Sequence, residues 1–316
     1  MAYRNAALIF CLLMLTACFD EGKTETEQLE SYHTALEKWR RINQQNLLES
    51  LNLLKETTNK YLDGKVTRVT WQNAWIQAHR RWLENSSLGF VSELDQIDAW
   101  PIAPGFLDSI VGYPQTGIIN DISLNISSQI LRQQHQITDS REVSLGFHVL
   151  EYYVFARPEA DLHGKDEPCS RRRILVGLVA EMLLLDVSQM LRNPEHQREP
   201  LLEKMLNRTH TLLSEFNRIG EHGQFSESSL ANISVPLQSM KKLTQKPVDL
   251  SNYLTGLDKE LTKVFLSSLY EAIDLLDSPS GLSEASSSRL LLLLSSLSHN
   301  LEDFLRLSER RSIAKT

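Results

Sequence analysis

The motif G-x-H-x-x-E, at residues 146–151, places a histidine and a glutamate, both of which can bind metal, in an otherwise apolar run. If the run is helical, His148 and Glu151 lie three positions apart on one face, where an imidazole and a carboxylate can converge on one ion. Ser144 and Arg141 would extend this polar face toward the N-terminus. Because ionisable groups in a core are costly unless paired or metal-bound, the pattern predicts either a metal site or a His–Glu pair that satisfies itself inside a bundle.

The motif is incomplete as a zinc-peptidase signature. Such helices carry two histidines one turn apart and a glutamate general base, whereas here Tyr152 follows Glu151 and Phe147 precedes His148. One nitrogen and one oxygen come from the motif, so further ligands must come from elsewhere. A mixed histidine and carboxylate site suits iron, manganese or zinc better than calcium. A hydrolytic pair of Ser144 with His148 lacks the nucleophile elbow and oxyanion hole that such chemistry needs.

The first residues form a targeting segment. One cation, Arg4, precedes an apolar run at 6–15 that is too short to span a bilayer, and the run ends in Leu15-Thr16-Ala17-Cys18. This order is similar to a bacterial lipobox. We therefore expect residues 1–17 to be a signal peptide and Cys18 to be lipidated, so that it anchors the protein to a membrane.

The composition of the mature chain excludes several classes of site. Removal of the signal peptide with its one cation changes the formal charge from −7 to −8, which disfavours nucleic acid as a partner. Of three cysteines, Cys11 leaves with the signal and Cys18 carries lipid, so Cys169 has no partner for an intramolecular disulfide or a cysteine zinc cluster.

The residues after Cys18 bear on where the protein is held. Phe19, directly after the cysteine, favours sorting to the outer membrane, and the polar residues 18–30 are expected to form a tether.

Helical periodicity dominates the rest of the chain and predicts an all-α fold of two packed helical bundles. The predicted helices cover about 27–62, Trp71 to Trp82, the motif, 170–191, 199–219, 226–243, 250–277 and 283–307. A polar break near residue 160 divides the chain into an N-terminal bundle at 31–160 and a C-terminal bundle at 161–316.

A loop-rich segment near 86–121, punctuated by glycine and proline, interrupts the helices. Long loops in helical proteins are more often functional than idle. The segment carries several acidic residues, any of which could fold back onto the helix of His148: Glu93, Asp95, Asp98, Asp108 and Asp121.

Several short motifs occur in an order that resembles the imelysin family of bacterial envelope proteins. They are the lipobox, Trp71-x-x-Ala74-Trp75 on a helix that runs to Glu84, Ile97-Asp98-Ala99-Trp100-Pro101, Phe106-Leu107-Asp108, Gly117-Ile118-Ile119-Asn120-Asp121, the core that begins at Gly146, and Arg171-Arg172-Arg173. The chain departs from the family pattern at Ser87-Leu88-Gly89 and at Ala103, both of which border the expected site.

The resemblance implies two helical bundles, a periplasmic or outer-membrane location, and a metal site at His148 and Glu151 that also takes Glu84 and Asp108. Gly146, Ser144, Arg141 and Trp100 would surround that site. The family is classed with metallopeptidases, while some relatives belong to iron-uptake systems.

Three functional hypotheses follow. The first is a lipid-anchored periplasmic protein that binds a metal ion, iron before zinc, and serves iron uptake with an envelope partner protein. The second is a metal-dependent peptidase, so whether the chain is an enzyme stays open. The third is a non-catalytic adaptor that binds haem, a polysaccharide or an envelope protein through the loops at 86–121.

Overall fold

The chain is all-α, as predicted, in a computed structural model that describes residues 25–87, 95–192, 200–278 and 281–313. These residues contain no strand. The predicted signal peptide and Cys18, the predicted site of lipidation, lie outside the described residues. The described part of the chain is helical from Glu25 onward, so the last part of the predicted tether is helical instead.

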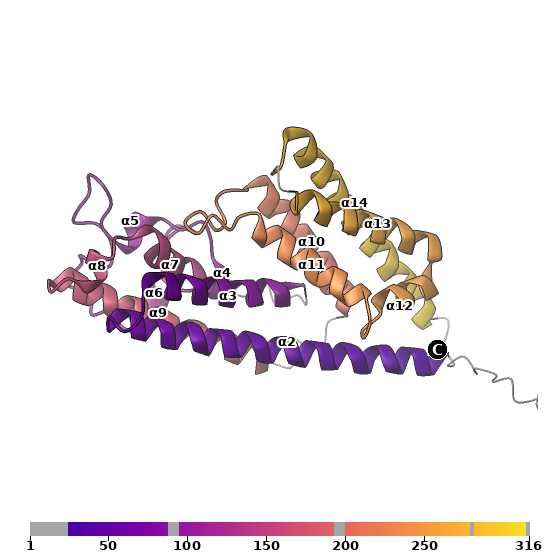
Figure 1. Ribbon diagram of the computed structural model, residues 1–316, viewed down its shortest axis with the longest axis horizontal. Coiled ribbons are helices and arrows are strands. Elements are labelled where there is room, and N and C mark those ends of the chain that lie inside the picture. Colours follow the sequence, from indigo (N-terminus) through magenta and orange to yellow (C-terminus); the bar gives the residue numbers. More distant parts are fainter. Residues whose placement is uncertain (1–24, 88–94, 193–199, 279–280, 314–316) are drawn as a thin grey trace, which may run out of the picture.

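The first bundle is built along one long helix. Helix α2 (Glu25–Leu62) runs along one side of the molecule, and α3 (Arg68–Ser86) and α9 (Glu167–Arg192) pack against it (Figure 1). The side chain of Thr67 caps α3 by accepting a hydrogen bond from the backbone N–H of Thr70. The three tryptophans of α3 are buried and share a core face, as apolar residues at helical spacing do.

Short elements fill one end of this bundle, and the first two of them lie in the segment near 86–121 that was predicted to be rich in loops. They are α4 (Asp95–Asp98), α5 (Pro104–Leu107), α6 (Ser128–Gln134), α7 (Phe147–Glu151), the π-helix η2 (Tyr152–Ala156) and α8 (Ala160–His163). The G-x-H-x-x-E motif therefore lies on a helix of little more than one turn, continued by η2.

In the part of the chain that the structure describes, the second bundle comprises five helices. They are α10 (Leu201–Asn217), α11 (Ala231–Thr244), α12 (Leu250–Leu257), α13 (Lys259–Leu276) and α14 (Glu284–Ile313). Helix α14 packs on α10 and α13, while α11 contacts α3 of the first bundle. The predicted helix at 250–277 is two helices, because the side chain of Asp258 accepts a hydrogen bond from Leu261 N at 2.8 Å and starts α13.

Helix α9 groups with the first bundle rather than the second. It packs against α2, α4, α6, α7 and α8, so the packing places the division of the chain after Arg192 and not near residue 160. Helix α9 is long and apolar enough to cross a bilayer, but 56% of its apolar window is buried inside the protein, as in a core helix.

The helix that carries His148 begins at Phe147, so the predicted polar stripe back to residue 141 does not form. Gly146 precedes α7 with a φ of +91°, a conformation that favours glycine. A Cβ atom at this position would lie 2.4 Å from the carbonyl oxygen of Ile97. Gly146 thus lets the start of α7 approach the backbone of α4, the short helix that ends at Asp98.

We expect Gly146→Ala to lower the free energy of unfolding by at least about 3 kcal/mol, because it adds steric overlap with α4 to an unfavourable φ. Gly64→Ala is the matched control: Gly64 has a φ of +71° but no atom within 4 Å of the added Cβ. The control should cost only about 1 kcal/mol. Equal losses for the two variants in urea denaturation would contradict the close approach of α7 to α4.

Candidate metal centre

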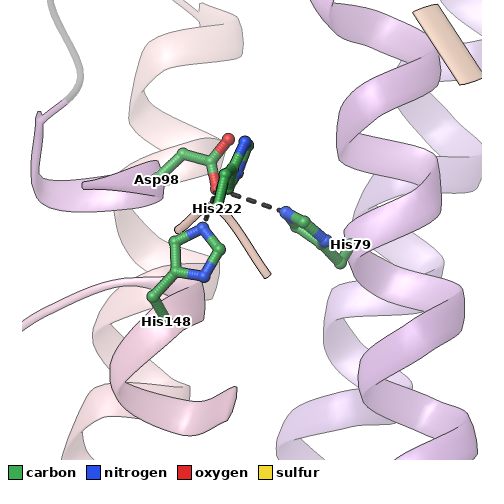
Figure 2. Close-up of side chains that lie close together, drawn as sticks. All are labelled: His79, Asp98, His148 and His222. Atoms are coloured by element: carbon green, nitrogen blue, oxygen red, sulfur yellow. Dashed lines mark hydrogen bonds and ion pairs between the residues drawn. The ribbon is translucent and has the colours of Figure 1, made fainter. Parts of the chain in front are cut away.

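Four buried or half-buried side chains converge where the two bundles meet: His79, Asp98, His148 and His222 (Figure 2). One ligand atom from each lies within 4.8 Å of the others. Oδ1 of Asp98 is the common neighbour, at 3.1 Å from Nε2 of His148 and 3.2 Å from Nε2 of His79. Nε2 of His222 lies 3.9 Å from the same oxygen.

Helix α3 positions His79 on its buried tryptophan face. The imidazole packs against Trp75, with ring centroids 4.7 Å apart. One turn later, Trp82 donates a hydrogen bond from Nε1 to Oδ2 of Asp98 at 2.7 Å. The same helix face therefore fixes both a histidine and the carboxylate opposite it, and it leaves Oδ1 of Asp98 turned toward the histidines.

Glu151 orients His148 from behind. Its Oε2 lies 2.6 Å from Nδ1 of His148, while its Oε1 accepts hydrogen bonds from the backbone N–H of Ser226 at 2.8 Å and of Phe225 at 3.2 Å. The hydroxyl of Ser226 also donates to Oε1, at 2.5 Å. A carboxylate behind an imidazole is a common arrangement at metal sites, where it fixes the ring and makes its other nitrogen the ligand.

The protonation of the cluster follows from these contacts. Both partners of His148 are carboxylates, which only accept hydrogen bonds when ionised, so the ring donates from both nitrogens. Burial alone would lower the pKa of His148, but the hydrogen bonds to Asp98 and Glu151 outweigh it and raise the pKa to about 10. Burial likewise would raise the pKa of Glu151, yet His148 and Ser226 hold it at about 2.

The pKa values of the other two groups of this network, His79 and Asp98, are both lowered. Burial lowers the pKa of His79, although its hydrogen bond to Asp98 opposes the change, so the ring is neutral. Burial would raise the pKa of Asp98, but the surrounding histidines keep it well below its usual range. The centre therefore holds the ionised carboxylate of Asp98, and the groups nearest to it are the N–H groups of imidazole rings.

His222 comes from the loop between α10 and α11, and its ring lacks ordinary polar partners. The ring stacks on Trp100, with centroids 4.7 Å apart. Within the described part of the chain, neither ring nitrogen has a hydrogen-bond partner, although both are buried. Oε2 of Glu215 lies 3.8 Å from Nδ1. A buried imidazole with two unsatisfied nitrogens calls for an explanation, and a bound ion supplies one.

The donor set fits a transition-metal ion. Four ligand atoms about 2.0–2.2 Å from one tetrahedral ion lie roughly 3.3–3.6 Å apart. Oδ1 of Asp98 already has about this spacing from Nε2 of His148 and of His79, at 3.1 and 3.2 Å. The most widely separated of the four atoms, which all lie within 4.8 Å, would have to approach one another by about 1 Å. Three imidazole nitrogens and one carboxylate oxygen suit zinc, iron and similar metals, not calcium. His79, Asp98, His148 and His222 would hold the ion, and Glu151 would support His148 from outside.

The centre opens to solvent through a small cavity of about 250 Å³. The Asp98 side chain is 20% exposed there, whereas the His79 and His148 side chains are only 2% and 3% exposed. The walls include Trp82, Trp100, Arg208 and Arg218. A larger cavity of about 990 Å³ lies between α2, α12 and α14 and contains none of the four residues, so its size does not identify it as the site of chemistry.

The structure does not bring two predicted ligands, Glu84 and Asp108, into the cluster. The carboxylate of Glu84 is 2.6 Å from Nη1 of Arg81 and 3.3 Å from Nζ of Lys242. Asp108 is fully buried and makes a two-point ion pair with Arg172, at 2.7 and 2.9 Å. Because cations already neutralise both carboxylates, neither group is available to an ion at His148.

The residues predicted to surround the site fall into two groups. Gly146 and Trp100 lie against it, the first beside α4 and the second on the ring of His222. Ser144 donates instead to the carbonyl oxygen of Leu131, at 2.6 Å. Arg141 is exposed and pairs with Asp139, because the chain before Phe147 is not helical.

Sequence reasoning missed two of the three histidines. His79 follows Ala78 on the tryptophan face, so the helical spacing that marked the core also marked His79 as buried. His222 sits between Glu221 and Gly223 in a break between helices, where nothing in the local sequence distinguishes it from an exposed loop residue. Asp98 was one of five acidic candidates in the loop-rich segment, and spacing could not choose among them.

Comparisons with known proteins agree with the fold. The family model described as imelysin matches residues 29–288. An iron-regulated protein A precursor from Parabacteroides distasonis has a similar structure, with a TM-score of 0.62 and 13% identity over 84% of this chain and 90% of that one. An imelysin-like protein from Psychrobacter arcticum aligns with a TM-score of 0.55 and 14% identity over 90% and 95%. No curated protein sequence matches.

We expect Asp108→Asn to destabilise the fold by about 3–5 kcal/mol, because it removes the ion-pair partner of the buried guanidinium of Arg172. Metal binding should stay intact. Asp139→Asn, which breaks an exposed pair with Arg141, should change the melting temperature little. Loss of metal binding in well-folded Asp108→Asn would instead make Asp108 a ligand.

Low pH should reproduce part of the loss of stability that is expected for Asp108→Asn. Burial opposes ionisation of Asp108, but Arg172 and Arg157 hold its pKa below 3.8. Its contribution to stability is therefore complete above about pH 3.8 and is lost as the pH falls through the lower pKa of the folded state. Urea denaturation between pH 5 and pH 2 should show the wild type converging on Asp108→Asn, and a constant difference would contradict the ion pair.

Proposed function

Because this chain belongs to the imelysin family, we propose that it is a metal-binding protein of the bacterial cell envelope that serves iron uptake. The observation that carries the proposal is the convergence of three histidines and Asp98 on one point between the bundles. The unsatisfied nitrogens of His222 support it, because a self-paired core network would have no reason to keep them. Iron is the first candidate metal and zinc the second.

The envelope location and the route to iron uptake rest on two further indications. The N-terminal lipobox predicts that Cys18 carries lipid, so that the protein is held at a membrane and faces the periplasm, most naturally at the outer membrane. One structural relative is named an iron-regulated protein. A protein tethered in this way would pass its ion to an envelope partner protein, and no nucleic acid is involved.

A peptidase is less well supported than a binding protein. Metal-dependent hydrolysis of a peptide needs a carboxylate free to act as general base beside the ion. Of the acidic groups that the structure describes at the cluster, none is free: Glu151 is bound by His148 and Ser226, and Glu215 by Arg208. The cavity of about 250 Å³ is also small for a polypeptide segment.

Isothermal titration of the demetallated full-length chain with Zn²⁺, and with Fe²⁺ under anaerobic conditions, tests the proposal. We expect one ion per chain in the wild type and no measurable binding in His148→Ala or His79→Ala, which remove ligands. Glu84→Gln should bind normally, since that carboxylate pairs with Arg81. His299→Ala removes an exposed histidine elsewhere and is the control. Normal binding by His148→Ala would refute the site.

Glu151→Gln tests the supporting role of the carboxylate. The amide can still accept or donate a hydrogen bond, but it no longer makes the imidazole of His148 a stronger ligand. We expect metal affinity to fall by about 10–100-fold with the stoichiometry unchanged. Complete loss of the ion would show that Glu151 is itself a ligand, as the sequence had suggested.

A further inference from the structure

We infer that the centre takes its metal in the divalent state and discriminates against trivalent ions, so that the iron it binds is ferrous. The inference rests on the proposed function and names the class of ion that the site accepts. Three features of the described residues carry it: the kind of donor atoms, the number of negative charges that face the ion, and the hydrogen bond that engages the second oxygen of Asp98.

The donor atoms are mostly nitrogen. His79, His148 and His222 each offer a neutral imidazole once they bind a metal, and Asp98 is the one oxygen donor among the four clustered residues. Trivalent iron is a harder ion than divalent iron or zinc and gains most from several anionic oxygen ligands. A set of three imidazoles and one carboxylate therefore favours the divalent ion.

The fixed charges around the cluster balance two positive charges. Three carboxylates touch its side chains: Asp98 itself, Glu151 behind His148, and Glu215 beside His222. Glu215 is neutralised by a buried two-point contact with Arg208, at 2.7 and 3.3 Å. Asp98 and Glu151 remain, so a divalent ion makes the centre neutral and a trivalent ion leaves one buried positive charge. Such a charge is costly beside side chains as deeply buried as His79 and His148, which are 2% and 3% exposed.

The cavity wall adds no anion to offset that charge. Arg218 lies over the ring of Trp100 at 4.6 Å and pairs with Glu221, so this wall residue and its partner together are neutral. The second oxygen of Asp98 is occupied by Trp82 at 2.7 Å. Asp98 therefore offers one oxygen, and the indole N–H draws negative charge away from it.

Zn²⁺ and Ga³⁺ are suitable probes, because both have closed shells, resist redox change and differ in charge. Each is titrated into the demetallated full-length chain at free concentrations buffered by nitrilotriacetate. We expect one Zn²⁺ per chain, bound at least about 100-fold more tightly than Ga³⁺. Anaerobic Fe²⁺ should compete with Zn²⁺, whereas ferric nitrilotriacetate should not.

His222→Asp tests the cause, because it exchanges a neutral donor for an anionic one in a loop. We expect the ratio of Zn²⁺ to Ga³⁺ affinity to fall at least about tenfold, through a gain for Ga³⁺. His222→Asn removes the imidazole without adding charge, so it should weaken Zn²⁺ without improving Ga³⁺. Circular dichroism and thermal melts establish that both variants are folded.

The outcomes separate this inference from the function on which it rests. If Ga³⁺ binds the wild type as tightly as Zn²⁺ or more so, metal binding stands and the divalent assignment falls. If His222→Asp leaves the affinity ratio unchanged, the charge balance is not its cause and the inference is overturned. If neither ion binds the wild type, the proposed metal-binding function itself fails.

Discussion

The carboxylate of Asp98 is the group on which the arrangement of the first bundle depends. A buried carboxylate needs donors from several directions, and here they come from Trp82 and His79 on α3 and from His148 on α7. These helices are distant in sequence, so satisfying one charge requires that α3, α4 and α7 meet at a point. Gly146 permits the meeting, because any larger residue would hold α7 away from α4.

Much of the fold could be predicted because helical periodicity is a local property of the sequence. The long helix α2 and the tryptophan-bearing helix α3 both followed from the spacing of apolar residues. The division between bundles did not, because a polar break at residue 160 marks only a loop, while the side on which α9 packs is decided by tertiary contacts.

The site was half predictable for the same reason. His148 and Glu151 share one short helix, so their spacing indicated chemistry, although Glu151 supports the imidazole from behind instead of facing the other ligand atoms. Asp98, His79 and His222 lie on three other segments, and no pattern in the sequence tells which side chains a fold will bring together. Glu84 and Asp108 had suitable chemistry, but arginine and lysine neighbours engage both. Choosing among acidic residues requires knowing where the cations are.

The position of His222 has a consequence for how such a protein can diverge. Three of the four donors belong to packed helices, where a substitution would also disturb the hydrophobic core. The fourth, His222, belongs to the loop between α10 and α11. Substitutions in that loop could alter which ion a descendant of this chain prefers without repacking either bundle. Related proteins could then share one architecture and still differ in the metals they carry, with the loop acting as the variable part of the site.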